Sequence, residues 1–199
     1  MGLGKQAKTL SKRQVDQLLW FCSTRRNSLR NQVIVLLSVK AGLRAKEMAN
    51  LKWSMVTDSS GQLSDAIHLT NNASKGKSGR VIPINSELRS KLIELFSKES
   101  QRGQFSLRQS YVIRTERSER TSAQAVVNMF AYWYAELGFT GCSSHSGRRT
   151  FITNAARKIS QVGGSLRDVQ SLAGHSSEST TERYIDTSGK AKRLVVQLV

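Results

Sequence analysis

Apolar residues recur at helical spacing along most of the chain. The first stripe runs from Val15 to Cys22, and Ser11 with Gln14 three positions later forms a capping-box pattern before it. Further helices are predicted by RNQVIVLLSVKAG, which ends at Gly42, by the short AKEMANLKW, and by SELRSKLIELFSK and SAQAVVNMFAYWYAELG. This periodicity predicts a mainly helical chain.

A different pattern begins at Trp53. The runs WSMV, AIHLTN and RVIPI are short and β-like, and polar segments that contain glycine separate them. We expect a small antiparallel sheet with a basic hairpin tip at Lys75 to Lys77. Pro83 lies in the last run and predicts an edge strand, because proline cannot donate a ladder hydrogen bond. SYVIRT predicts one more short strand or extended segment.

Three further helices are predicted near the C-terminal end, at 146–159, 165–173 and 177–186, with GGS and GHS between them. Residues 1–9 are expected to be a flexible basic arm, residues 10–187 one domain, and residues 188–199 a C-terminal tail. The predicted fold class is therefore mainly α with a small antiparallel β-sheet (α+β).

Composition restricts the partners more than it restricts the fold. The 199 residues suit one domain, and the net charge of +17 indicates a polyanionic partner, either nucleic acid or an anionic membrane surface. The sequence contains no apolar run long enough for a membrane span and no apolar core of a secretory signal. We therefore expect a cytoplasmic protein that binds nucleic acid.

The two cysteines, Cys22 and Cys142, suggest a reducing compartment and residues that serve in packing. Cys142 lies three residues before His145, a spacing that could bind a metal ion. No second pair of cysteines or histidines stands at metal-ligand spacing in the sequence, so we expect no metal site.

Residues suited to phosphoryl chemistry gather in two short segments. GHSSESTTERY places His175 nine residues before Tyr184, and SHSGRRTF places His145 three residues before Arg148. Arginine binds two phosphate oxygens with its planar fork, and a phenol can serve as a nucleophile. Together these residue types point to attack on a phosphodiester.

Four ordered motifs make the chain resemble the catalytic domain of the tyrosine recombinases, the phage-integrase family. They are AGLRAKEMANL, SKGKSGRVIPI, HSGRRTF and LAGHSSESTTERYID, and the resemblance extends from about Leu10 to Tyr184. It implies the tyrosine recombinase catalytic-domain fold. It also implies strand breakage and rejoining of double-stranded DNA without a cofactor, in a bacterial or phage-encoded protein associated with the nucleoid.

The resemblance also assigns roles to individual residues. The implied catalytic set is Arg44, Lys75, His145, Arg148, His175 and Tyr184, with Glu47 in support. The two arginines and His175 would hold the phosphate, His145 would be the general base toward Tyr184, and Lys75 would protonate the leaving oxygen. Lys77, Arg80 and Arg149 are expected to contact DNA.

Each of these residues also has a structural interpretation. In so basic a chain, an isolated Arg44 would more often be a surface residue, and Glu47 more often bonds an arginine or the backbone. Lys77 competes with Lys75 for the same role, although the position of Pro83 favours Lys75. Among the other phenols, Tyr132 and Tyr134 fit a packed apolar helix, Tyr111 begins a β-type run, and His68 fits a strand.

Two departures from the family pattern stand out. Gly147 replaces a leucine common in the second motif, which predicts a lost packing contact. Only about ten residues precede the domain, so the chain is either a minimal recombinase or a catalytic fragment.

The function that fits best is site-specific recombination, and two alternatives remain: a type IB topoisomerase, which relaxes DNA without exchange, and a non-catalytic DNA-binding accessory protein. The expected assembly is a tetramer on DNA. The apolar LVVQLV of the tail would dock on a neighbouring protomer or pack on its own domain.

Overall fold

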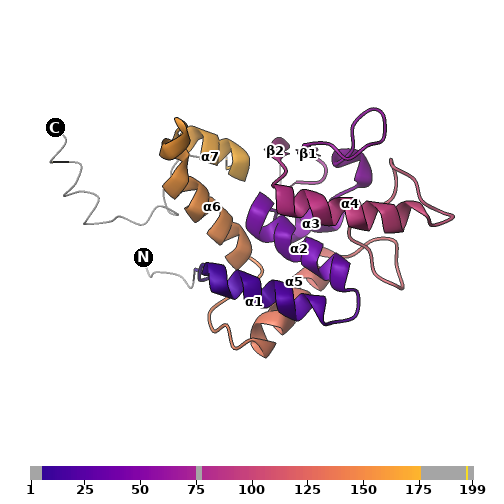
Figure 1. Ribbon diagram of the computed structural model, residues 1–199, viewed down its shortest axis with the longest axis horizontal. Coiled ribbons are helices and arrows are strands. Elements are labelled where there is room, and N and C mark those ends of the chain that lie inside the picture. The colour runs from indigo at the N-terminus through magenta and orange to yellow at the C-terminus, as the bar shows by residue number, and fades with distance from the viewer. Residues whose placement is uncertain (1–5, 75–77, 176–195, 197–199) are drawn as a thin grey trace.

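The computed structural model describes residues 6–74, 78–175 and 196 (Figure 1). The described part contains seven α-helices, two 3₁₀ turns and one two-stranded sheet, which confirms the mainly helical α+β prediction. The helices are α1 (Lys12–Ser23), α2 (Ser28–Ala41), α3 (Ala45–Asn50), α4 (Ser86–Ser100), α5 (Ala123–Glu136), α6 (Ser146–Lys158) and α7 (Leu166–Ala173). None of the helices in this part is long and apolar enough to cross a membrane.

Helix α2 lies at the centre of the molecule. Its residues from Val33 to Val39 are all buried, and the helix contacts α1, α4 and α6 (Figure 1). A helix that is apolar on every side can be stable only if neighbouring elements cover it on every side. The packing of α2 therefore organises the core and fixes where its C-terminal end lies.

The sheet is one antiparallel hairpin made of β1 (Ala66–Leu69) and β2 (Arg80–Pro83). The base of its loop is closed by Asn71, whose side-chain oxygen accepts a hydrogen bond from the Gly79 N–H at 2.9 Å. The predicted basic tip, residues 75–77, lies outside the described residues.

Of the other predicted β-type segments, WSMV is not a strand and forms a 3₁₀ turn, Trp53–Met55. SYVIRT pairs through an isolated bridge between Lys52 and Tyr111, which fits the extended segment that was the alternative to a strand. The reason that WSMV is not a strand is packing, because the indole of Trp53 is fully buried against Phe96 with their ring centroids 5.1 Å apart. A short apolar run cannot reveal such a partner in advance.

Part of the expected flexible arm lies against the body of the domain. The Lys8 N–H donates to the Gly141 carbonyl at 3.0 Å, and Arg149 donates to the Ala7 carbonyl at 2.9 Å. The prediction of a free arm is therefore wrong for Ala7 and Lys8. Arg149, predicted to contact DNA, makes this intramolecular bond through one terminal nitrogen, Nη1.

Gly147 does not leave the gap that the sequence suggested. A Cβ atom at this position would lie 2.8 Å from the Ser38 Cβ and 3.1 Å from a methyl group of Val39. There is no room for a side chain, because α6 approaches α2 closely here. The expected loss of packing is thus wrong, and the glycine is what allows the contact.

The two predicted helices at 146–159 and 165–173 are present as α6 and α7, and a short 3₁₀ turn, Ile159–Val162, joins them. The predicted helix at 177–186 and the tail at 188–199 fall outside the described residues, apart from residue 196.

Candidate active site

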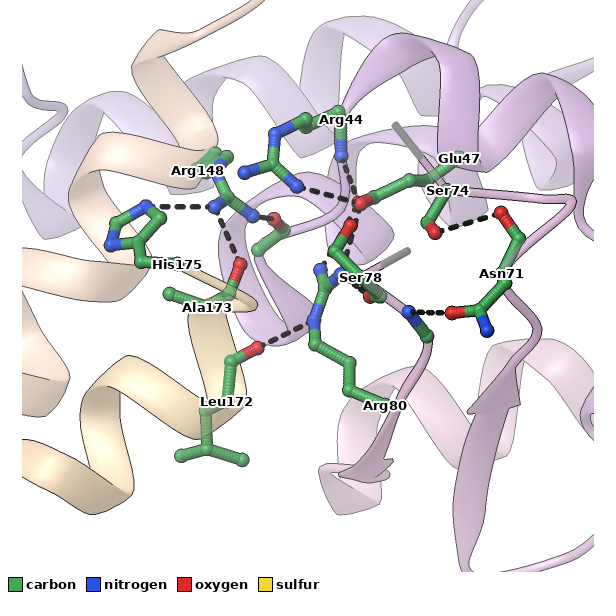
Figure 2. A network of polar contacts seen from close by, with 12 residues as sticks. Arg44, Glu47, Asn71, Ser74, Ser78, Arg80, Arg148, Leu172, Ala173 and His175 are labelled. Atoms are coloured by element: carbon green, nitrogen blue, oxygen red, sulfur yellow. Dashed lines mark hydrogen bonds and ion pairs between the residues drawn. The ribbon is translucent and has the colours of Figure 1, made fainter. Parts of the chain in front are cut away.

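Three segments far apart in the sequence meet beside the C-terminal end of α2 (Figure 2). Helix α2 stops at Gly42, which adopts a left-handed conformation with φ +64°, and Arg44 then becomes the N-cap residue of α3. Helix α6 brings Arg148, and the residue that follows the glycine stop of α7 is His175. The structure thus gathers the predicted residues of three motifs.

Arg148 is held by the ends of two helices. One terminal nitrogen donates to the Gly42 carbonyl at 2.7 Å, and the other donates to the Ala173 carbonyl at 2.6 Å. The second nitrogen also lies 3.0 Å from Nε2 of His175. Carbonyl groups at helix C-termini carry partial negative charge, so they stabilise a guanidinium that is only 4% exposed. The position of this cation is therefore set by the backbone.

Glu47 binds Arg44 and Arg80 through both of its carboxylate oxygens. One carboxylate oxygen accepts from Nη1 of Arg44 at 2.8 Å, and the other accepts from the Arg44 backbone N–H at 2.8 Å. Arg80 adds a fork to the same two oxygens, at 2.9 and 3.1 Å. The structural interpretation of Glu47 is the one that the contacts support.

The carboxyl group of Glu47 is fully buried, and burial is the largest single influence on its pKa, in the upward direction. The hydrogen bond and the charge of Arg80, with the backbone N–H and the charge of Arg44, outweigh that influence and lower the pKa below its usual value. Glu47 is therefore an anion that orients two arginines.

Arg80 occupies a different place from the one predicted. Its side chain is 5% exposed, and besides Glu47 it donates from Nε to the Leu172 carbonyl at 2.8 Å. All three of its nitrogens are engaged within the protein (Figure 2). This corrects the expectation that Arg80 contacts DNA, because its guanidinium is turned into the domain.

Both candidate histidines are held toward the neutral form. Partial burial lowers the pKa of His175 to about 4, and the charges of Arg148, Arg44 and Arg80 add to the effect. His145 is exposed at the start of α6, and its pKa is lowered by partial desolvation first and then by Arg148 and Arg44. At neutral pH both imidazoles are therefore uncharged.

The remaining predicted site residues, Lys75, Lys77 and Tyr184, lie outside the described residues. Of the competing phenols, Tyr134 is buried as expected, whereas Tyr132 is 53% exposed, so the prediction that it belongs to the core is wrong. Within the described ranges, no group of three or more histidine, cysteine, aspartate or glutamate side chains could hold a metal ion.

Sequence reasoning missed the carbonyl groups that hold the arginines, at Gly42, Leu172 and Ala173. The only sequence signal for them was the pair of glycines that end helices α2 and α7, Gly42 and Gly174. Such glycines predict where a helix ends but not which side chain binds its last carbonyl groups.

Chemically, Arg44 oriented by Glu47 and Arg148 beside the neutral imidazole of His175 form a site suited to a phosphate group.

Comparison with known proteins identifies the family to which the chain belongs. The model of the phage integrase family matches residues 8–190. The chain belongs to the phage integrase family. Among other members, tyrosine recombinase XerA of Pyrococcus furiosus is 26% identical over 190 residues, which are 96% of this chain and 61% of that protein. The 199-residue chain therefore spans about three fifths of the length of that XerA protein.

Solved structures of the phage integrase family share the fold. A crystal structure of XerA recombinase superposes with a TM-score of 0.74 at 23% identity, covering 96% of this chain and 64% of that one. XerH site-specific recombinase bound to palindromic difH substrate gives a TM-score of 0.71 at 17% identity, covering 94% of this chain and 51% of that one. At these identities the likeness shows the fold.

Proposed function

We propose that the protein is a site-specific DNA recombinase that cleaves and rejoins strands through a 3′-phosphotyrosyl intermediate on Tyr184. The observation that carries the proposal is the guanidinium of Arg148, held by two helix-end carbonyls beside His175. Membership of the phage integrase family supports the same reaction.

The arginines would stabilise the transition state. Attack on a phosphodiester builds negative charge on the nonbridging oxygens, and cations already fixed in place stabilise that charge without reorganising. Arg148 is fixed by the backbone and Arg44 by Glu47. His175, neutral because its pKa is lowered to about 4, would add a hydrogen bond.

Two groups would move the protons. His145 has a lowered pKa, so its imidazole is uncharged at neutral pH and its unprotonated nitrogen can accept a proton from Tyr184 as that phenol attacks. Lys75 would protonate the leaving 5′ oxygen. The phosphotyrosyl bond keeps the energy of the broken linkage, so rejoining requires neither ATP nor a metal ion.

The partner would be double-stranded DNA. The Tn1549 transposon integrase, which shares this fold, was solved in complex with circular intermediate DNA, and the net charge of +17 suits a polyanion. We infer that residues 10–187 form the catalytic domain, that Lys77 and Arg149 contact phosphates, and that four copies assemble on paired sites in the cytoplasm. Residues 188–199 would dock on a neighbouring copy.

Covalent trapping tests the proposal. Repeats sought by sequencing the DNA that flanks the gene supply the candidate site, and a nicked duplex carrying that site should give a protein–DNA adduct on a denaturing gel, since loss of a short strand prevents rejoining. Tyr184→Phe should abolish the adduct while the Kd for DNA stays within about twofold, because contacts between basic side chains and phosphates dominate DNA affinity and a single hydroxyl contributes little. Tyr132→Phe removes an exposed phenol and is the matched control.

An adduct that persists in Tyr184→Phe would assign the nucleophile elsewhere. Relaxation of supercoiled plasmid without paired sites would instead indicate a topoisomerase.

A further inference from the structure

Arg80 lies where the β-hairpin, helix α3 and the end of α7 meet (Figure 2). It is the first residue of β2, and its guanidinium forks onto both oxygens of Glu47 while Nε donates to the Leu172 carbonyl. One side chain therefore joins three elements that are separated by 33 and 92 residues in the sequence.

The contact between Arg80 and Glu47 also affects Arg44. Glu47 accepts hydrogen bonds from both arginines on the same pair of oxygens, so the two cations share one buried anion. If the fork from Arg80 is removed, the carboxylate keeps its charge but loses the partner that fixes its plane. The guanidinium of Arg44 would then lose its fixed orientation.

The contact between Arg80 and the Leu172 carbonyl also affects His175. The carbonyl belongs to the last turn of α7, and the next carbonyl along, that of Ala173, holds Arg148. Gly174 then turns the chain with φ +61°, and a Cβ there would lie 2.9 Å from both Cδ and Nη1 of Arg80. The arginine thus packs directly under the turn that delivers His175.

We propose that Arg80 is a positioning residue that fixes Arg44 and His175 relative to each other for strand cleavage. This inference rests on the proposed function. Arg80 is not assigned a catalytic role, because both of its terminal nitrogens bind the buried carboxylate of Glu47 and its Nε binds the Leu172 carbonyl. It acts through Arg44 and His175.

Single-turnover cleavage of the nicked duplex tests the role. Arg80→Met keeps the aliphatic stem and removes the fork, and we expect cleavage to slow by about 100-fold, the loss typical of reacting groups displaced by about 1 Å. Arg80→Lys keeps a point charge without the fork and should recover only part of that loss. The Kd for DNA should not change, because Arg80 faces inward.

Arg114→Met is the matched control. It removes an arginine that donates to the partly buried Glu99 at 2.6 Å, away from the site. Its cleavage rate should equal that of the parent at a temperature where all variants are folded, as judged by thermal unfolding.

A substrate with a neutral methylphosphonate at the scissile position separates positioning from general loss of structure. One nonbridging oxygen is replaced by a methyl group, so less negative charge develops and the fixed arginines matter less. The fold-loss of Arg80→Met should be much smaller on this substrate. An equal loss on both substrates, or parent-like cleavage by Arg80→Met, would overturn the inference.

These failures differ from a failure of the proposed function. In that case the parent protein itself would form no adduct on the nicked duplex.

Discussion

Two networks in this protein are built from the same parts and do different work. Glu47 is shared by Arg44 and Arg80, and Glu99 is shared by Arg102 and Arg114. In both, one carboxylate receives two arginines, one of them from three residues away. A sequence search for paired charges would treat the two networks alike.

Burial and surroundings separate them. Glu47 is fully buried and Arg80 is 5% exposed, whereas Glu99 is 10% exposed and Arg102 is 34% exposed. The first network lies beside Arg148 and ties three elements together, while the second joins α4 to the loop that follows it. The comparison teaches that an arginine–glutamate cluster becomes part of a site when low dielectric and converging helix ends hold it in place.

The largest expected difference between the two networks is in stability. Glu47→Gln should lower the free energy of unfolding by about 3 kcal/mol, because it leaves the buried guanidinium of Arg80 without its counter-charge. Glu99→Gln should cost about 1 kcal/mol, since water can reach the arginines there. Urea denaturation of both variants measures the two values, and equal losses would break the comparison.

The next largest expected difference between the two networks is in the rate of DNA cleavage. Arg148→Lys replaces a fork held by two carbonyls with a point charge, and we expect single-turnover cleavage to fall by about 100-fold, or about 2.7 kcal/mol. Arg102→Lys in the other network should cleave at the rate of the parent. If both variants cleave normally, the cluster beside Arg148 is not the active site.

A third prediction sharpens the role of close packing near the site. Gly147→Ala should destabilise the fold by about 2 kcal/mol, because the new methyl group overlaps Ser38 and Val39. Gly103, beside the second network, has open space around it, so Gly103→Ala should change stability by less than about 0.5 kcal/mol. Thermal unfolding of the pair checks the difference.

The smallest effect concerns pH. The pKa of His175 is lowered from 6.5 to about 4 in the folded protein, so between these values the unfolded chain binds more protons than the folded one. Stability from this group is full above about pH 6.5 and falls toward pH 4, and solvent screening keeps the loss small because the imidazole is only partly buried. His175→Gln should flatten the curve of unfolding free energy against pH in that window.

A curve of unchanged slope in His175→Gln would assign the dependence to other groups. Glu47 contributes in a more acidic window, because its lowered pKa lies below its usual value of 4.5. Its stabilisation is lost only as the pH falls through that lower pKa.

Much of the fold was readable from the sequence. The apolar stripe after Ser11 and the glycine stop at Gly42 predict helices that the structure contains as α1 and α2. These signals are local, since helical periodicity and capping depend on residues within a few positions of each other. The same local logic fails at Trp53, where a short apolar run becomes a 3₁₀ turn because the indole finds a distant aromatic partner.

The candidate site divides in the same way. The sequence by itself determined the family and the chemical groups, since the order and spacing of Arg44, His145, Arg148 and His175 are properties of the chain. Only the tertiary structure decided what holds them. Arg148 bonds a carbonyl 106 residues away, and Arg80 one 92 residues away, because packing of α6 and α7 against α2 and the hairpin brings those atoms together. Backbone carbonyls carry no side-chain signature, so no motif could announce them.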